Sequence, residues 1–384
     1  MPNALRILTV IGARPQIIKA AAISRAVAKQ PPGRVTETLL HTGQHYDANM
    51  SQVFFDELGI PPAHINLNTG SGAHGATTAR MIQGIEEVLQ RGEHDIVLLY
   101  GDTNSTLAGA LAAAKLHIPV AHVEAGLRSF NKRMPEELNR ILCDHCSTWL
   151  FCPTTTAVSN LQKEGFPARI ADRPSADHPR VMLCGDVMYD NSLHFSALAR
   201  ERSNIIRDLG LTPDGFALVT IHRDHNTDDP LRALAIVRSL LAIKNGHLLP
   251  LVLPLHPRAR KMFDQLLPAE TLHALMNDPD IHILPPAGFL DMIALESHAR
   301  LVITDSGGVQ KESYFFQKPC VILRPETEWV ELVEHGQAIL ADADPSRIAA
   351  AVAHFLRGAP IECPPLFGDG RAGECILNEL LDHH

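Results

Sequence analysis

Acidic side chains follow two predicted strands and open one predicted helix. Asp102 ends one apolar run in "LLYGDTNST", Glu124 ends another in "VAHVEAGLRS", and Glu136 begins a helix in "MPEELNR". Several carboxylates at one site suit proton transfer at carbon, where one acts as base and another as acid. Structural alternatives stay open: Asp102 could cap the next helix, acidic first-turn residues Glu136 and Glu137 compensate a helix dipole, and Arg140 could pair with Glu136.

Basic side chains and histidines occupy comparable positions. Arg14 and Lys19 follow the first predicted strand in "IGARPQIIKA", from which both could reach an anion. His222 and His256 end two later strands, in "LVTIHRDHN" and "LVLPLHPR". No third ligand follows either histidine at the spacing of a metal site, so the sequence predicts no metal.

The stretch "LVITDSGGVQKES", Leu301 to Ser313, ends a predicted strand with two glycines at a predicted helix start. First-turn N–H groups and the helix dipole attract anions there, and glycine lets a phosphate approach the backbone. Ser306, Gly307 and Gly308 therefore predict a phosphate site, and Glu312 on the same helix could accept hydrogen bonds from sugar hydroxyls. The chain lacks the Walker spacing, a nicotinamide fingerprint and a serine nucleophile elbow.

These residues need a scaffold, and the alternation of short apolar runs with amphipathic stretches supplies it. The pattern predicts an α/β protein with two doubly wound, Rossmann-like domains, whose parallel strands carry ligands beyond their carboxyl ends, in a cleft between the domains. We expect an N-terminal domain over residues 1–186, joined by a C-terminal helix over 366–384, and a second domain over 187–365. The predicted strands are Arg6 to Ile11, Glu37 to His41, Asp95 to Tyr100, Pro119 to Val123, Trp149 to Cys152, Val181 to Cys184, Phe216 to Ile221, Leu249 to Leu255, Ile281 to Leu284, Leu301 to Thr304 and Cys320 to Leu323.

Composition excludes several classes of partner. The formal net charge of −9 argues against nucleic acid, although a local pocket can still bind an anion. No signal peptide or membrane-spanning run is apparent, and seven scattered cysteines fit a reducing cytoplasm. The CxxC spacing of "CDHC", Cys143 to Cys146, lies in a predicted helix without a second pair, which favours helix packing over a metal or redox role.

Taken together, the motifs resemble the non-hydrolysing UDP-N-acetylglucosamine 2-epimerase family along nearly the whole chain. The resemblance is carried by "GARPQIIK", "TGQHYD", "YGDTNSTLA", "HVEAGLRS", "PEELNR", "GDVMYD", "LPLHP", "TDSGGVQKE" and the closing "GDG". It implies a GT-B type fold and a homodimeric, cytoplasmic isomerase that needs no metal or cofactor. The family removes the proton at carbon 2 of a UDP-sugar while UDP leaves carbon 1, and then re-adds both to give the epimer through a glycal.

The resemblance also implies residue roles. It makes Asp102, Glu124 and Glu136 the acid/base candidates, with His222 against the departing diphosphate. The sugar, phosphate, ribose and uracil contacts then fall to Arg14, Lys19, Arg140, Met292, Ser306, Gly307, Gly308 and Glu312. In bacterial relatives, residues matching Gln44 and His45 lie near a regulatory UDP-sugar site.

Several positions depart from the usual family pattern. Gln16 replaces a glutamate after "RP", Trp329 replaces an arginine, and the loop before "PEE" is shortened to "SFNKRM". These features resemble the branch that acts on UDP-2,3-diacetamido-2,3-dideoxyglucuronate and supplies surface polysaccharides. Arg14, Lys132 and Arg133 are then available to bind a uronate, although the last two could equally be solvated loop residues.

Three functions are thus open to the sequence. The first is the non-hydrolysing 2-epimerase, acting on UDP-N-acetylglucosamine or its diacetamido uronate analogue. The second is a hydrolysing relative that releases UDP and N-acetylmannosamine. The third is a GT-B glycosyltransferase or a silent nucleotide-sugar binding protein, which the strand-end carboxylates disfavour.

Overall fold

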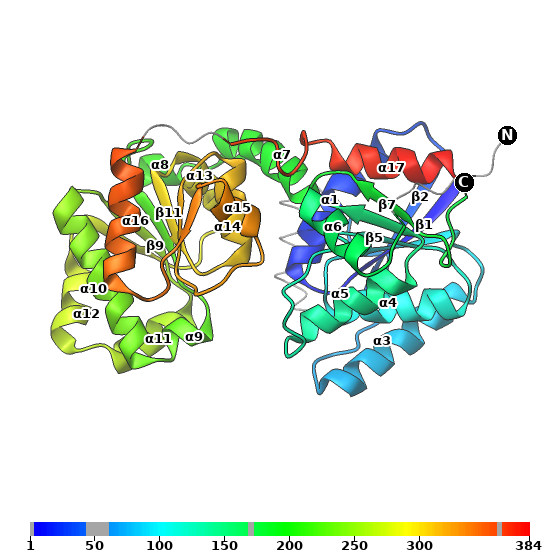
Figure 1. The fold of residues 1–384 in the computed structure, drawn as a ribbon, viewed down its shortest axis with the longest axis horizontal. Helices are drawn as coiled ribbons and strands as arrows, with labels where there is room; N and C mark the ends of the chain where they lie inside the picture. The colour runs from blue at the N-terminus through cyan, green and yellow to red at the C-terminus, as the bar shows by residue number, and fades with distance from the viewer. Residues whose placement is uncertain (1–3, 44–60, 168–172, 359–362) are drawn as a thin grey trace. The chain divides into compact units, whose positions relative to one another are not determined.

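The chain forms two compact units, each built around a parallel sheet (Figure 1). The computed structural model describes residues 4–43, 61–167, 173–358 and 363–384. Unit 1 comprises residues 1–191 and 365–384, and unit 2 comprises residues 192–364. The helix α7 (Val187–Arg202) begins in unit 1 and ends in unit 2.

The described part of unit 1 contains a seven-stranded sheet in the order β3-β2-β1-β4-β5-β6-β7, with every pair parallel. Its strands are β1 (Leu5–Ile11), β2 (Val35–His41), β3 (Ile65–Asn66), β4 (Ile96–Tyr100), β5 (Val120–Val123), β6 (Trp149–Cys152) and β7 (Arg180–Leu183). Its helices are α1 (Arg14–Ala28), α3 (His74–Leu89), α4 (Asn104–Lys115), α5 (Pro135–Cys146), α6 (Thr155–Lys163) and α17 (Ala372–Asp382). The order reverses between β1 and β4, which is the topological switch point where doubly wound folds bind ligands.

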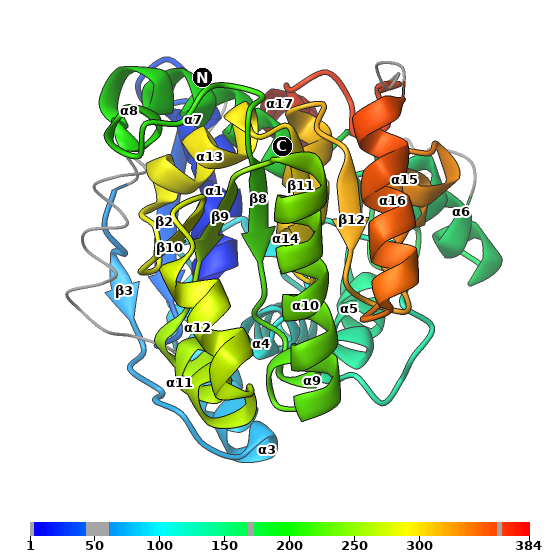
Figure 2. The ribbon, with the colours of Figure 1, turned by 90° about the vertical axis from the view of Figure 1, so that its left-hand side faces the viewer.

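The described part of unit 2 contains a six-stranded parallel sheet in the order β10-β9-β8-β11-β12-β13 (Figure 2). Its strands are β8 (Ala217–Thr220), β9 (Leu251–Pro254), β10 (Ile281–Leu284), β11 (Leu301–Thr304), β12 (Cys320–Ile322) and β13 (Ala338–Leu340). Its helices are α8 (Ile205–Asp208), α9 (Asp224–Thr227), α10 (Pro230–His247), α11 (Pro257–Leu266), α12 (Ala269–Asn277), α13 (Phe289–His298), α14 (Gly307–Phe315), α15 (Val330–Glu334) and α16 (Pro345–Arg357).

Alternation along the strands of unit 2 builds a core on each face of its sheet. Ala217 and Val219 of β8 pack in the cluster that includes α10 and α16, whereas Leu218 packs in the cluster on the α13 side. Successive side chains of a strand point to opposite faces, so a strand covered by helices on both sides reads as an uninterrupted apolar run. This is why the apolar runs located the strands, and the predicted two-domain α/β architecture is confirmed.

Two strands were not predicted, β3 and β13, of two and three residues. The predicted C-terminal helix is α17, which packs on α1 within unit 1. Among the described residues, no helix is both long and apolar enough to cross a membrane.

Candidate active site

The turns after β4 and β5 carry Asp102 and Glu124, at the carboxyl end of the sheet in unit 1. The Glu124 backbone has a φ of 74°, in the left-handed region that residues other than glycine rarely adopt. Such strained residues persist only where their surroundings hold them, and they cluster at functional sites. Asp102 does not cap the next helix, because the N-cap of α4 is Thr103, whose hydroxyl accepts from the Thr106 N–H. The capping alternative for Asp102 is therefore wrong.

Each of these carboxylates forms an ion pair with a predicted site cation. Lys19 of α1 pairs with Glu124, and the two side chains are only 14% and 10% exposed. Arg140 of α5 pairs with Asp102. A Cβ on Gly101 would lie 3.1 Å from the Lys19 Nζ and 3.2 Å from a Glu124 carboxylate oxygen, so glycine leaves room for the first pair. The structure thus joins four of the predicted residues in two ion pairs at neighbouring turns.

The first turn of α5 separates its two glutamates. Glu136 is exposed, whereas Glu137 is buried and accepts hydrogen bonds from the Ser129 N–H, the Ser129 hydroxyl and the Phe130 N–H, each at 2.9 Å. Arg140 pairs with Asp102 and lies 3.2 Å from Glu137, so the structural alternative in which it pairs with Glu136 is wrong. Glu137 consequently holds the loop before α5 in place, and Glu136 is left facing solvent.

Gln16 connects the turn after β1 to the turn after β4. Its side-chain oxygen accepts from the Gly12 N–H at 2.9 Å and the Ala13 N–H at 3.2 Å. Its amide nitrogen donates to the Tyr100 carbonyl at 2.9 Å and to the Thr106 hydroxyl at 3.0 Å. A buried carboxylate could not donate the second pair of bonds, which gives a physical reason for glutamine at this position.

The other cations of unit 1 that were predicted to bind substrate lie at the surface. Arg14, the first residue of α1, is exposed, and so are Lys132 and Arg133 in the loop before α5. Gln44 and His45, the predicted regulatory pair, lie outside the described residues.

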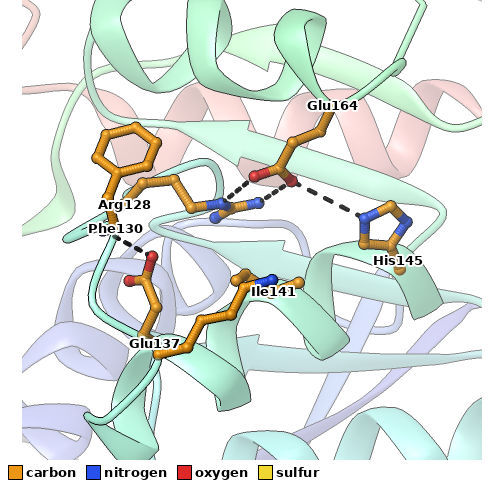
Figure 3. A pocket seen from close by; sticks show the side chains of 7 residues that line it. Arg128, Phe130, Glu137, Ile141, His145 and Glu164 are labelled. Atoms are coloured by element: carbon orange, nitrogen blue, oxygen red, sulfur yellow. Dashed lines mark hydrogen bonds and ion pairs between the residues drawn. The ribbon is translucent and has the colours of Figure 1, made fainter.

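A pocket of about 610 Å³ opens beside this loop within unit 1 (Figure 3). Figure 3 shows Glu164 contacting the Arg128 guanidinium on one side and His145 on the other. The lining residues are Arg128, Phe130, Lys132, Glu137, Ile141, His145 and Glu164. Lys132 therefore lines a pocket that has charged side chains on one side and the exposed Phe130 ring on another.

In unit 2, His222 follows β8 and is held by the residue that follows β11. The Asp305 carboxylate accepts from the His222 N–H at 2.9 Å and the Arg223 N–H at 3.1 Å. Desolvation lowers the pKa of His222, and His256 lowers it further, while Asp305 opposes both effects. His256 caps α11, where its Nδ1 accepts from the Arg258 N–H at 3.3 Å.

Helix α14 begins directly after the double-glycine turn, as predicted. Ser306 is its N-cap residue, but its hydroxyl makes no capping bond, so it does not satisfy the first-turn donors. The Glu328 carboxylate, paired with Arg324 at 2.9 Å, lies so close to Gly307 that a Cβ there would overlap it. A negative group already stands at this helix start, which is the place where the dipole favours an anion.

Two further predicted contacts lie on α13 and α14. Glu312 of α14 is half-buried, and a hydrogen bond joins its carboxyl group to that of the fully buried Glu296. Burial and then the charge of Glu312 raise the pKa of Glu296 well above its usual value. Met292 packs partly buried against the α13-side core of unit 2. Within the described residues, no three histidine, cysteine or acidic side chains gather as a metal ion would need.

Comparison with known proteins identifies the family. The model described as UDP-N-acetylglucosamine 2-epimerase matches residues 26–381. The chain belongs to this family. It is 47% identical over 378 residues to the UDP-2,3-diacetamido-2,3-dideoxy-D-glucuronate 2-epimerase of Pseudomonas aeruginosa, covering 98% of this chain and 99% of that one. It is 38% identical to the UDP-N-acetylglucosamine 2-epimerase of Methanocaldococcus jannaschii, with the same coverage.

Solved structures of the family share its fold. The Methanocaldococcus jannaschii UDP-GlcNAc 2-epimerase in complex with UDP-GlcNAc and UDP superposes with a TM-score of 0.83 at 38% identity, covering 98% of this chain and 99% of that one. Phytolacca americana UGT2, at 12% identity and a TM-score of 0.61 over 100% and 94% of the two chains, shows a likeness of fold alone. The predictions of the family, of a GT-B type fold and of an isomerase in UDP-sugar 2-epimerisation are confirmed.

The sequence predicted the four residues of the two ion pairs individually, but not the buried polar residues that hold their turns in place. It did not single out His122, Arg128, Asn139 or Asp144, all of them buried polar residues beside the two turns. The signal available was a run of charged and polar residues, "CDHC" and "HVEAGLR", inside segments that otherwise read as core.

Proposed function

We propose that this member of the family inverts carbon 2 of UDP-2,3-diacetamido-2,3-dideoxyglucuronate without hydrolysing it. The observation that carries the proposal is the 47% identity, over nearly the full length of both chains, to the Pseudomonas aeruginosa enzyme with that name. Identity to the Methanocaldococcus jannaschii UDP-N-acetylglucosamine 2-epimerase is 38% over the same length. The short loop of residues 129–134 and Trp329 support the same branch.

The carboxylates of unit 1 are the proposed acid and base. One removes the proton at carbon 2 as the carbon 1–oxygen bond to UDP breaks, which leaves a glycal and free UDP. A proton then returns to carbon 2 from the opposite face while UDP re-adds at carbon 1, so atoms and charges balance. Asp102 and Glu124 are fixed by Arg140 and Lys19, and fixed groups lower the entropic cost of reaching the reactive geometry.

The two cations of these ion pairs have a second proposed role. When a carboxylate takes up a proton it loses its charge, and its partner Lys19 or Arg140 is then able to attract the phosphates or the sugar oxygens. Arg14, exposed at the start of α1, adds a further cation to the same turn region. Glu136 is the third acid/base candidate, and its exposure leaves it accessible to a substrate.

Unit 2 is proposed to bind the UDP moiety. The start of α14 at Ser306, Gly307 and Gly308 supplies N–H donors for phosphate, and the imidazole of His222 contacts the departing diphosphate. Glu312 accepts from the ribose hydroxyls, and Met292 provides the apolar contact to the uracil. The expectation that a cleft between the two domains holds the substrate stays a prediction.

Proton NMR in heavy water tests the proposal directly. With the diacetamido uronate we expect an epimer that is still attached to UDP and carries deuterium at carbon 2. Free UDP with free sugar would instead support the hydrolysing alternative, and no turnover of either UDP-sugar would leave a glycosyltransferase or a binding protein. Epimer formed without solvent deuterium would refute proton transfer and point to hydride chemistry.

The substrate branch can be tested at the loop before α5. A uronate carboxylate needs a cationic partner, and Lys132 and Arg133 are both exposed there. The double change Lys132→Ala with Arg133→Ala should lower kcat/KM for the uronate. The loss of transition-state stabilisation should be about 1–3 kcal/mol, the scale of hydrogen bonds to charged groups. UDP-N-acetylglucosamine lacks that carboxylate, so its kcat/KM should change far less.

A matched control separates a local contact from a general loss of charge. Lys163→Ala with Arg91→Ala removes the same two charges from exposed positions elsewhere in unit 1 and should leave both substrates unaffected. Equal losses on both substrates in the loop variant, or a wild-type preference for UDP-N-acetylglucosamine, would rule out the uronate assignment.

The family resemblance also predicts a homodimer, a cytoplasmic location and a place in surface polysaccharide precursor synthesis. Light scattering coupled to size exclusion gives the oligomeric state, and a mass near that of one 42.0 kDa chain would contradict the dimer.

A further inference from the structure

A buried histidine, which the mechanism above does not use, joins the two turns that carry the proposed acid and base. His122 lies on β5, two residues before Glu124, and its side chain is fully buried. Its Nε2 lies 2.8 Å from the Gly101 carbonyl oxygen, next to Asp102. Its Nδ1 lies 2.6 Å from a carboxylate oxygen of Asp144, on α5.

Both ring nitrogens of His122 therefore face acceptors. A neutral imidazole has one N–H, so one of the two short contacts would bring a nitrogen lone pair against an oxygen lone pair. The protonated ring donates to both. Protonation of Asp144 is the alternative, but its second oxygen forms an ion pair with the buried Arg128 at 2.7 Å and accepts from the Gly126 N–H at 3.2 Å, contacts that favour an ionised carboxylate.

The charges around this cluster balance when the histidine is cationic. Arg128 also bonds Glu164 through two contacts of 2.7 Å, so His122 and Arg128 are matched by Asp144 and Glu164. The other titratable group facing His122 is the Cys143 thiol. Burial on its own would lower the pKa of His122, but Cys143 and Asp144 raise it well above its usual value.

We propose that His122 is a cationic positioning residue that fixes the turns of Asp102 and Glu124 by donating from both of its ring nitrogens. Through Nε2 it holds the Gly101 carbonyl, and through Asp144 it connects to the Gly126 N–H, two residues after Glu124. The inference rests on the proposed function, since the turns matter because they carry the acid and the base.

The neighbouring carbonyls of the Asp102 turn are held in the same manner. The Tyr100 carbonyl accepts from Gln16, the Gly101 carbonyl from His122, and the Asp102 carbonyl from the Asn139 amide at 2.9 Å. Three consecutive carbonyl groups are thus bound by side chains from α1, β5 and α5. The histidine is the charged member of this set and the one that also reaches the Glu124 turn.

The protonation state can be measured on the wild-type protein. Nitrogen-15 NMR of histidine-labelled protein at pH 7.5 should show two protonated ring nitrogens for His122. His41 is an internal comparison: it is also buried, its Nδ1 accepts from the Gly43 N–H at 2.9 Å, and burial lowers its pKa to about 4. His122→Gln and His41→Gln spectra assign the two signals. An unprotonated nitrogen in His122 would overturn the proposal.

Kinetics then separate positioning from a purely structural role. His122→Gln should lower kcat by about 10- to 100-fold, because a displacement near 1 Å at reacting groups costs about that much. KM and UDP affinity should stay within about threefold, and deuterium exchange at carbon 2 should fall with kcat. His41→Gln is the matched control, since it replaces another buried histidine of unit 1, one that bonds the Gly43 N–H, and we expect its kcat within about twofold of wild type.

Unchanged kcat in His122→Gln, or an equal loss in His41→Gln, would refute the positioning role. If His122→Gln does not fold, Asp144→Asn serves as the second variant for both the assignment and the kinetics, because the Asp144 carboxylate lies 2.6 Å from the His122 Nδ1 and its loss shifts that signal. A wild-type enzyme that epimerises no UDP-sugar would refute the proposed function, while the two-proton NMR signature would remain a separate result.

Discussion

Replacing Gln16 with glutamate tests whether the turn of Asp102 depends on a donated amide. The buried amide nitrogen donates to Tyr100 and Thr106 while its oxygen accepts from Gly12 and Ala13, so the opposite amide orientation would oppose donor to donor and acceptor to acceptor. In Gln16→Glu the second oxygen can replace the donor only if the introduced carboxyl is protonated.

The size of the destabilisation depends on whether the introduced carboxyl is protonated or ionised in the folded protein. Keeping the proton at pH 7, against an unfolded-state pKa near 4.3, costs about 3.7 kcal/mol. Losing it leaves the Tyr100 carbonyl without its donor from Gln16, at about 1–3 kcal/mol, and adds repulsion between two oxygens. We therefore expect Gln16→Glu to lower the free energy of unfolding by about 2–4 kcal/mol at pH 7, or Tm by roughly 4–16 °C for a domain of this size.

The stability difference between Gln16→Glu and wild type should change with pH in a defined direction. A carboxyl whose pKa is raised in the folded state binds more protons folded than unfolded, so the variant loses stability relative to wild type as pH rises above about 4.3. Thermal unfolding from pH 4 to pH 8 measures this, with Gln162→Glu, an exposed position on α6, as the isosteric control. A Tm within about 2 °C of wild type at every pH would show that the Gln16 assignment is wrong; a loss independent of pH would point to packing.

Two further predictions concern the same unit. Asp102→Asn, Glu124→Gln and Glu136→Gln should each lower kcat by at least about 100-fold, the scale of lost general acid or base catalysis, and near-normal rates in all three would show that the site is elsewhere. Asp190 accepts from the Ala372 and Gly373 N–H groups, and burial raises its pKa to about 6. The wild-type protein should therefore lose stability relative to Asp190→Asn as the pH rises from about 4 to about 6. Above about pH 6 the difference in stability should stay constant. Denaturant titrations at four pH values check the second prediction, and a difference that does not vary with pH would contradict it.

The sequence predicted the strand ends well because a strand buried on both faces is an apolar run, and the residue after such a run stands at the ligand-binding edge. Asp102, Glu124 and His222 were found in that way. Local spacing could not predict partners, however. Arg140 lies one turn from Glu136 in the sequence, yet it pairs with Asp102, 38 positions away.

The sequence did not predict the cluster of buried polar residues around Asp144. Asp144 lies in "CDHC", whose cysteines drew attention to metal or redox chemistry, but the residue that connects elements there is the aspartate. Its partners come from β5 and from the loop that follows, so nothing within the helix itself reveals them. The packing of α5 against β5 brings the histidine, the arginine and the aspartate together.

The placement of α17 in unit 1 has a consequence for how the protein is made on the ribosome. Residues 365–384 belong to unit 1, although all of unit 2 precedes them in the chain. The α17 helix packs on α1 closely enough that a Cβ on Gly373 would lie 2.9 Å from the Ala22 carbonyl oxygen. During translation unit 1 therefore stays without its last helix, and α1 without its cover, until unit 2 has been synthesised, so unit 2 is the first continuous segment able to complete its fold.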